Sequence, residues 1–311
     1  PISLLLTSDE VVAAGIVTAG SSQVFARSLV VSGSMTSTSR LEASGSTLAS
    51  TGQMGCTALG CVAHLNYTER VSLSSMGTAI GGVVGVATPE MHLSGSASVN
   101  ASARGAAAAA GTSPGGTAST SGGGGAGGGH GGDGGQGQSN SVSGRAYGDM
   151  LWPATRGSGG GAGNYQYSSS SYKTDGGGGG GVIHLNVSGT LRVESGASIT
   201  SNGAAGEHGF RTSSSSSSYY YRPYAGGGGG SGGSVLIVAE SVLGSGLIQA
   251  SGGCVRLLLW PLRSSPSCGR LPCLHACPAL ACSTDTAPCS SVLSLCPLCV
   301  SGLVWPPPSD A

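Results

Sequence analysis

Hydrophobic and polar residues alternate most clearly in two stretches of the second half of the chain. In the first stretch the apolar positions are Ile183, Leu185 and Val187, followed by Leu191, Val193 and Ile199. In the second stretch they are Val235, Ile237 and Ala239, followed by Leu243, Leu247 or Ile248, and Ala250. A period of two places one set of side chains on one face, as a half-buried β-strand requires. The pattern therefore predicts strands, punctuated by turns at glycines, within residues 182–253.

A short phrase recurs along the chain: an apolar residue, then Ser-Gly, then a hydroxyl residue. Its three copies are Val31–Ser34, Leu93–Ser96 and Val187–Thr190. Repetition of a strand-turn unit is typical of a solenoid, in which each coil buries its apolar face by stacking on the next. We therefore expect an all-β fold, a right-handed parallel β-helix (β-solenoid) interrupted by disordered Gly/Ser-rich loops. A β-sandwich with long loops is the alternative.

Composition divides the chain into four regions. We expect solenoid repeats in residues 1–105 and a Gly/Ala/Ser-rich low-complexity insertion in residues 106–181. Residues 182–253 return to solenoid repeats, with a loop rich in Ser, Tyr and Gly at 204–230. Residues 254–311 are a Cys/Pro-rich tail, which we expect to be unstructured or non-native sequence. A cap or stalk held by disulfides is the alternative for this tail.

Composition also excludes some classes of function. Glycine occupies 59 of 311 positions, and charged residues make up only 8%, with a formal net charge of zero. Nucleic-acid binding needs clustered basic residues, which this chain lacks. No run of apolar residues is long enough for a transmembrane helix. The chain begins at Pro1 without an initiator methionine, so we interpret it as a piece of a longer protein.

The glycine runs and the strands that follow them carry a resemblance to a known family. The segments concerned are Gly127–Gly134, Ala146–Gly148, Trp152-Pro153, Gly176–Val187, Gly189–Val193, Ile199, Asn202-Gly203, Gly226–Ala239 and Gly246–Gly253. They resemble large glycine-rich surface proteins of plants and algae that contain pectin-lyase-like, adhesin-like parallel β-helix repeats. The resemblance covers residues 120–253 and implies a surface or wall-associated protein. It implies no catalytic residues.

Motifs for catalysis or metal binding are incomplete. The segment Gly128–Asp133 matches the opening of a calcium-binding nonapeptide repeat, but such sites need tandem copies and only one is present. Ser113 lies in a segment that matches the G-x-S-x-G motif of a nucleophile elbow, but Pro114 follows where a helix should begin. Asp9-Glu10 is the only adjacent pair of acidic residues, so no carboxylate pair for glycosidic hydrolysis stands out. We therefore expect a protein that is not an enzyme and that carries no cofactor or metal.

Several residues suggest an extracellular setting. The sequons at Asn66, Asn100 and Asn186 are candidate glycosylation sites. Cys56 and Cys61 are a candidate disulfide if the chain is secreted.

Tyrosines gather in the second insertion, at Tyr219, Tyr220, Tyr221 and Tyr224. Their rings are candidates for contacts with glycans or for oxidative cross-links. Packing of the rings against the flank of the solenoid is the alternative.

These features predict a non-catalytic structural or adhesive protein, extracellular or at the cell surface. Its expected partners are cell-wall or matrix polysaccharide or other surface proteins, and not nucleic acid. One alternative is a carbohydrate-active β-helix protein that binds or cleaves wall polysaccharide. An intracellular low-complexity scaffold is a third hypothesis.

Overall fold

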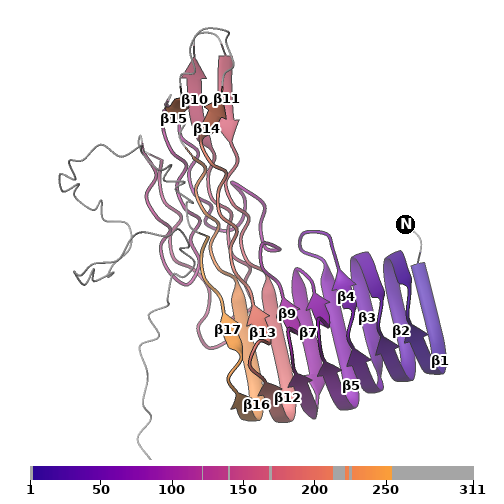
Figure 1. The fold of residues 1–311 in the computed structure, drawn as a ribbon. Helices are drawn as coiled ribbons and strands as arrows, with labels where there is room; N and C mark the ends of the chain where they lie inside the picture. Colours follow the sequence, from indigo (N-terminus) through magenta and orange to yellow (C-terminus); the bar gives the residue numbers. More distant parts are fainter. Residues whose placement is uncertain are drawn as a thin grey trace, which may run out of the picture. The chain divides into compact units, whose positions relative to one another are not determined.

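The computed structural model describes residues 3–120, 122–138, 141–167, 170–212, 221–223 and 226–253. Every regular element in these residues is a β-strand, and thirteen strands form one large sheet (Figure 1). Its first nine strands are β1 (Ser3–Ala13), β2 (Ile16–Val31), β3 (Ser34–Ser50), β4 (Gln53–Cys56), β5 (Val62–Leu73), β6 (Thr78–Ile80), β7 (Val83–Thr88), β8 (Glu90–Leu93) and β9 (Ser98–Asn100). The other four are β12 (Val182–Val193), β13 (Ser198–Thr200), β16 (Ser234–Gly244) and β17 (Leu247–Gln249). No described segment forms a helix long and apolar enough to cross a membrane.

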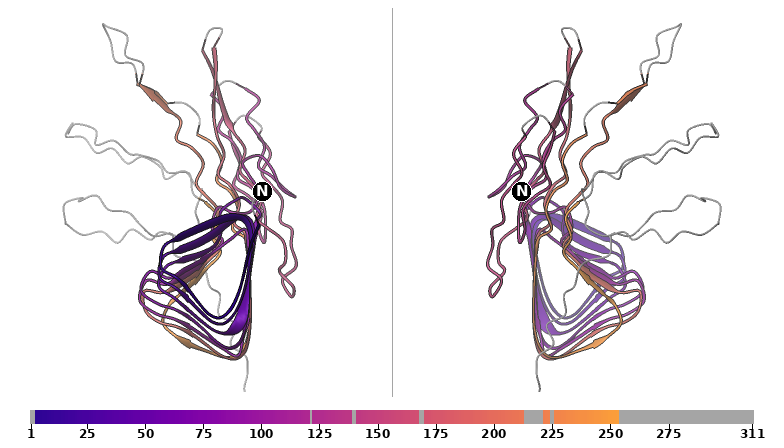
Figure 2. Two further views of the ribbon diagram at one scale, coloured as in Figure 1. Left: turned by 90° about the vertical axis from the view of Figure 1, so that its right-hand side faces the viewer. Right: turned by 90° about the vertical axis from the view of Figure 1, so that its left-hand side faces the viewer.

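All strand pairs in this sheet are parallel, and Figure 2 shows the strands following a triangular path. We call the thirteen strands the strand stack. Equivalent residues of successive strands form rows, one of which runs through Ser3, Ser21, Arg40, Val62, Val83, Val182 and Ser234. A β-sandwich is built from antiparallel sheets. Among the described residues, antiparallel strand pairs are limited to β10 (Gly163–Tyr167) with β11 (Ser170–Thr174) and β14 (Phe210–Thr212) with β15 (Tyr221–Pro223).

The core of the stack consists of rows of apolar side chains that face inward. One such row contains Leu29, Leu48, Val71, Met91 and Leu191, each at most 1% exposed. Full burial of one such side chain contributes about 1.5–3 kcal/mol, so each row adds to the stability of the stack. The alternation predicted for the first stretch is present, because Ile183, Leu185 and Val187 are buried.

The second stretch follows the prediction less closely. The register between β12 and β16 shifts after Val187, so that Val242 pairs with the buried Leu191 and Leu243 pairs with the exposed Arg192, although Val242 and Leu243 are both 51% exposed. Similarly, Ile248 continues the inward row of Ile199, whereas Leu247 pairs with Ser198. The predicted inward position of Leu243 is therefore wrong, since a one-residue slip moves a side chain to the opposite face.

Two long segments leave the stack at one corner. The shortest connection at this corner is Gly81-Gly82, which joins β6 to β7. At the equivalent position residues 101–181 join β9 to β12, and residues 201–233 join β13 to β16. Because these connections start and end at the same corner, their glycine runs emerge next to one another (Figure 2).

The described glycine runs are not the disordered loops that composition predicts. Their backbones are hydrogen-bonded to one another at 2.8–2.9 Å, in the donor–acceptor pairs Gly157 to Gly180, Gly160 to Gly177, Gly177 to Gly228 and Gly180 to Ser231. The bonds recur at every third residue. This is the period of a polyproline II helix, which has no internal hydrogen bonds, so its backbone groups are free to bond to neighbouring segments. We call residues 101–118, 122–129, 157–162, 176–181, 201–207, 226–233 and 250–253 the glycine bundle.

Segment 226–233 lies at the centre of the glycine bundle. It shares backbone hydrogen bonds with segments 122–129, 157–162, 176–181, 201–207 and 250–253. A Cβ atom added at Gly228 would lie 1.9 Å from the carbonyl oxygen of Ala126, and one at Gly233 would lie 1.9 Å from that of Gly181. At these two positions the segments pack too closely for a side chain. By composition the glycine runs resemble flexible linkers. Close packing between the segments explains instead why these positions are glycine.

Candidate functional site

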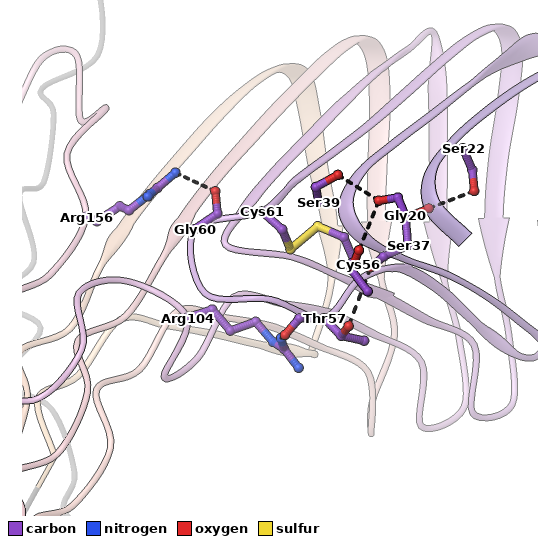
Figure 3. The surroundings of a disulfide bond; sticks show 11 residues. Gly20, Ser22, Ser37, Ser39, Cys56, Thr57, Gly60, Cys61, Arg104 and Arg156 are labelled. Carbon is purple, nitrogen blue, oxygen red and sulfur yellow. Dashed lines mark hydrogen bonds between the residues drawn. A yellow bond between two sulfur atoms is a disulfide. The ribbon is translucent and has the colours of Figure 1, made fainter. Parts of the chain in front are cut away.

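The corner where the glycine bundle meets the strand stack holds a disulfide between Cys56 and Cys61 (Figure 3). Cys56 ends β4, and residues 57–61 form the loop that leads to β5. Both cysteines are buried, at 0% and 4% exposure. The bond closes this loop at the base of the bundle.

Two arginines from the bundle side of the corner bind this loop. Arg104 Nη1 donates to the carbonyl oxygen of Thr57 at 2.7 Å, and Arg156 Nη2 donates to that of Gly60 at 2.8 Å (Figure 3). The Gly60 amide donates back to the Arg104 carbonyl oxygen at 3.2 Å. Burial lowers the pKa of Arg104 from its ordinary value, but a guanidinium stays charged in proteins. The disulfide loop thus anchors the bundle to the stack through two charged donors. Neither arginine carries a signal in the sequence, because each contacts a loop distant in sequence.

A cavity of about 890 Å³ lies between the glycine bundle, the segment within residues 130–153 and the first residues of β16. Its side-chain lining includes His130, Asp133, Tyr147, Asp149 and Met150, and much of the rest is glycine backbone. A ligand here would meet peptide groups more than side chains. The cavity was not predicted, since its walls come from segments that share no motif.

The polar side chains that line this cavity already have hydrogen-bond partners within the protein. His130 Nε2 lies 2.9 Å from Thr155 Oγ1, and the His130 ring contacts the Tyr147 ring edge-on with centroids 4.9 Å apart. The Tyr147 hydroxyl donates to the Arg156 carbonyl oxygen and lies 2.8 Å from Ser158 Oγ. These contacts hold the segment before residue 157 in place. The contacts of His130 and Tyr147 thus have a structural role and indicate no reaction.

Ser234 and His130 resemble two members of a catalytic triad but lack its geometry. Ser234 Oγ lies 3.5 Å from His130 Nε2 and donates instead to the Thr155 carbonyl oxygen at 2.6 Å. Burial lowers the pKa of His130, and a hydrogen bond with the Gly232 backbone partly offsets this effect. A triad also needs a carboxylate that orients the histidine. Within the described residues, no group of three His, Cys, Asp or Glu side chains is placed to hold a metal ion.

An apolar loop projects beside the cavity. Met150, Leu151 and Trp152 are 94%, 86% and 63% exposed. Asp149 Oδ1 fixes the loop by accepting hydrogen bonds from the amides of Leu151 and Trp152 at 2.8 and 3.2 Å. These bonds fix the backbone of the loop, which presents its apolar side chains to solvent.

The same loop rests on β12 through His184. The Trp152 ring lies 6.2 Å from the His184 ring, and His184 Nε2 lies 3.0 Å from the Pro153 carbonyl oxygen. These contacts place Trp152 over the outward face of the strand stack. The sequence signal for Trp152-Pro153 is its part in the family resemblance.

The three sequons lie in different surroundings. Asn66 and Asn186 are exposed on the outward face of the stack, and the residues on either side of each asparagine are buried. Asn100 is half-buried at the end of β9, and its Oδ1 accepts a hydrogen bond from the Ser102 amide at 2.8 Å. The structure therefore separates two exposed sequons, at Asn66 and Asn186, from a half-buried one at Asn100.

Some predicted residues fall outside the part of the chain that the structure describes. These are Tyr219, Tyr220 and Tyr224, and the whole of the tail at 254–311. For Tyr221 the structure describes the backbone alone, in β15. The proposed roles of the tyrosines and of the tail remain predictions.

Comparisons with protein-family models, with curated proteins and with solved structures find no match to this chain. The resemblance to glycine-rich surface proteins therefore remains an expectation from the sequence.

Proposed function

We propose that this chain is a non-catalytic extracellular protein of the cell surface or wall, with a structural or adhesive role. The observation that carries the proposal is that backbone hydrogen bonds hold the fold together. Hydrogen bonds between segments distant in sequence hold both the strand stack and the glycine bundle, as in the pairs Val83 with Val182 and Gly228 with Gly161. Such a fold provides rigid surface with few reactive side chains. That suits a scaffold or spacer better than a catalyst.

We infer further that the strand stack is a right-handed parallel β-helix. Parallel rows support this inference, because each strand pairs with a segment about 20 residues away unless an insertion intervenes. The right-handed sense is that of nearly all crossover connections between parallel strands. Each coil of such a helix buries its apolar row against the next.

Two features favour an extracellular location. Disulfides form and persist mainly in oxidising compartments, and the Cys56–Cys61 bond is buried at a corner that the bundle depends on. Two sequons, at Asn66 and Asn186, lie exposed on the outward face. Wall or matrix polysaccharide and other surface proteins are the partners that such a location offers.

A second candidate is a protein that binds polysaccharide, and the exposed loop at Met150–Trp152 favours it. Exposed Trp rings stack on the apolar faces of sugars, and Trp152 lies beside the outward row of the stack that contains Gln23, Glu42, His64 and His184. Loss of binding to wall polysaccharide in a Trp152→Ala variant, with Leu151→Ala as the matched control, would favour this candidate over a purely structural role.

Antibody labelling of intact cells tests the proposed location. The chain has a single lysine, Lys173, so amine-reactive surface labels are poorly suited. We expect an antibody against the purified chain to stain cells without permeabilisation, and the antigen to fractionate with wall or surface material. Staining that appears only after permeabilisation, with a cytosolic marker as control, would refute the proposal.

A further inference from the structure

Two of the three sequons share a longer motif and one structural position. Both Asn66 and Asn186 follow His-Leu and precede an apolar or aromatic residue and then a hydroxyl residue. Asn66 of β5 pairs with Ala87 of β7, and Asn186 of β12 pairs with the same Ala87 from the other side. The two asparagines thus stand in one outward row with a single strand between them. At the usual spacing of strands they lie about 10 Å apart.

The surroundings of these two side chains leave room for a bulky group. Both asparagines are exposed, as are Thr68 and Ser188, which complete their sequons. Ala87 between them has a small side chain. Neither asparagine side chain makes a hydrogen bond to another described residue. Each amide nitrogen is therefore available on an open face.

Asn100 is placed differently. It lies where the chain turns from β9 into the glycine bundle, and its Oδ1 is used by the Ser102 amide. Ser102 Oγ in turn accepts a hydrogen bond from the Asn202 amide at 3.0 Å, and the Asn100 carbonyl oxygen accepts one from the Gly81 amide at 3.2 Å. A glycan on Asn100 would have to fit against the base of the bundle.

We infer that Asn66 and Asn186 carry N-linked oligosaccharides, which stand as a pair on the outward face of β5, β7 and β12, and that Asn100 is unmodified. In the transfer, a bond forms between the asparagine Nδ2 and the anomeric carbon of the sugar. The bond from that carbon to a polyprenyl diphosphate donor breaks, and the amide proton leaves with the diphosphate. The inference rests on the proposed function, because the donor acts in the secretory pathway.

The position of the pair suggests what the glycans do. Their row also contains Phe25 of β2 and Val238 of β16, which are 48% and 50% exposed. Glycans on alternate strands of this row would separate that face from neighbouring proteins.

Site occupancy can be measured on the full chain purified from its own cells. Trypsin cleaves after Arg70, Arg104, Lys173 and Arg192, which places each sequon on its own peptide. Enzymatic release of N-glycans in heavy-oxygen water converts each modified asparagine to labelled aspartate. We expect the label at Asn66 and Asn186 and none at Asn100.

Sequon variants provide the controls. Thr68→Ala and Ser188→Ala keep both asparagines. Each substitution should lower the apparent mass on a gel by the mass of one glycan, whereas Asn100→Gln should leave the apparent mass unchanged. Label at Asn100, or no label at Asn66 and Asn186 in protein recovered from the cell surface, would overturn the inference and leave the proposed function standing. Protein found only inside the cell, with no site labelled, would overturn both.

Discussion

Substitution of Gly228 by alanine should destabilise the glycine bundle. The Gly228 amide donates to the Gly161 carbonyl oxygen, and its own carbonyl oxygen accepts from the Gly177 amide, both at 2.8 Å. An added Cβ would lie 1.9 Å from the Ala126 carbonyl oxygen and 2.4 Å from its carbon. These are backbone atoms, so no side chain can rotate away and the segments must move apart.

The expected magnitude follows from two costs. Overpacking a close-packed interior costs about 1–3 kcal/mol, and weakening the two hydrogen bonds of Gly228 adds about 1 kcal/mol. We therefore expect the free energy of unfolding to fall by roughly 2–4 kcal/mol. Guanidinium unfolding of the full chain, followed by circular dichroism, measures this fall.

Gly135→Ala is the matched control. No atom lies within 4 Å of a Cβ built at Gly135, so the substitution should change the free energy of unfolding by no more than about 0.5 kcal/mol. Equal effects of the two substitutions would refute the argument. They would mean that segment 226–233 is not held against its neighbours in solution.

Three further predictions concern single contacts. Reduction of the Cys56–Cys61 disulfide should lower the free energy of unfolding by about 2 kcal/mol, and identical unfolding curves with and without reductant would contradict its role at the corner. The Tyr67 hydroxyl is buried and makes no hydrogen bond within the described residues, and burial raises the pKa of Tyr67. Tyr67→Phe should therefore stabilise the chain by about 1 kcal/mol in the same unfolding assay, and a loss of stability would point to a hidden partner. The pKa of His130 is lower in the folded chain than its ordinary value. Neutral His130 therefore contributes fully to the free energy of unfolding above its ordinary pKa, and this contribution is lost as the pH falls through the folded pKa. Stability should thus decrease from neutral pH towards about pH 5, and less steeply in His130→Gln; parallel pH profiles would refute this.

The strands could be predicted from the sequence because their signal is local. Ile183, Leu185 and Val187 alternate with polar neighbours, and a period of two defines a strand whatever it pairs with. The register of β16 could not be predicted, since the shift after Val187 arises from pairing with another strand. The exposed position of Asn186 followed from the same local alternation.

The glycine bundle could not be predicted from the sequence. Glycine has no side chain, so its runs carry no pattern of apolar and polar positions. The partner of Gly228 is Gly161, in a different insertion, and only the common corner of the strand stack brings the two together. Contacts at the disulfide corner are equally distant, since Arg156 and Gly60 are separated by 96 positions.

Hydrogen exchange of the backbone amides tests most directly whether the glycine segments form a bundle. Mass spectrometry of proteolytic fragments can compare segments 157–162, 176–181 and 226–233 with β12 as an internal reference for stable structure. The account predicts that the glycine amides exchange far more slowly than those of an unfolded peptide, at a level comparable to β12. Exchange of these amides at the rate of an unfolded peptide, while β12 stays protected, would contradict it.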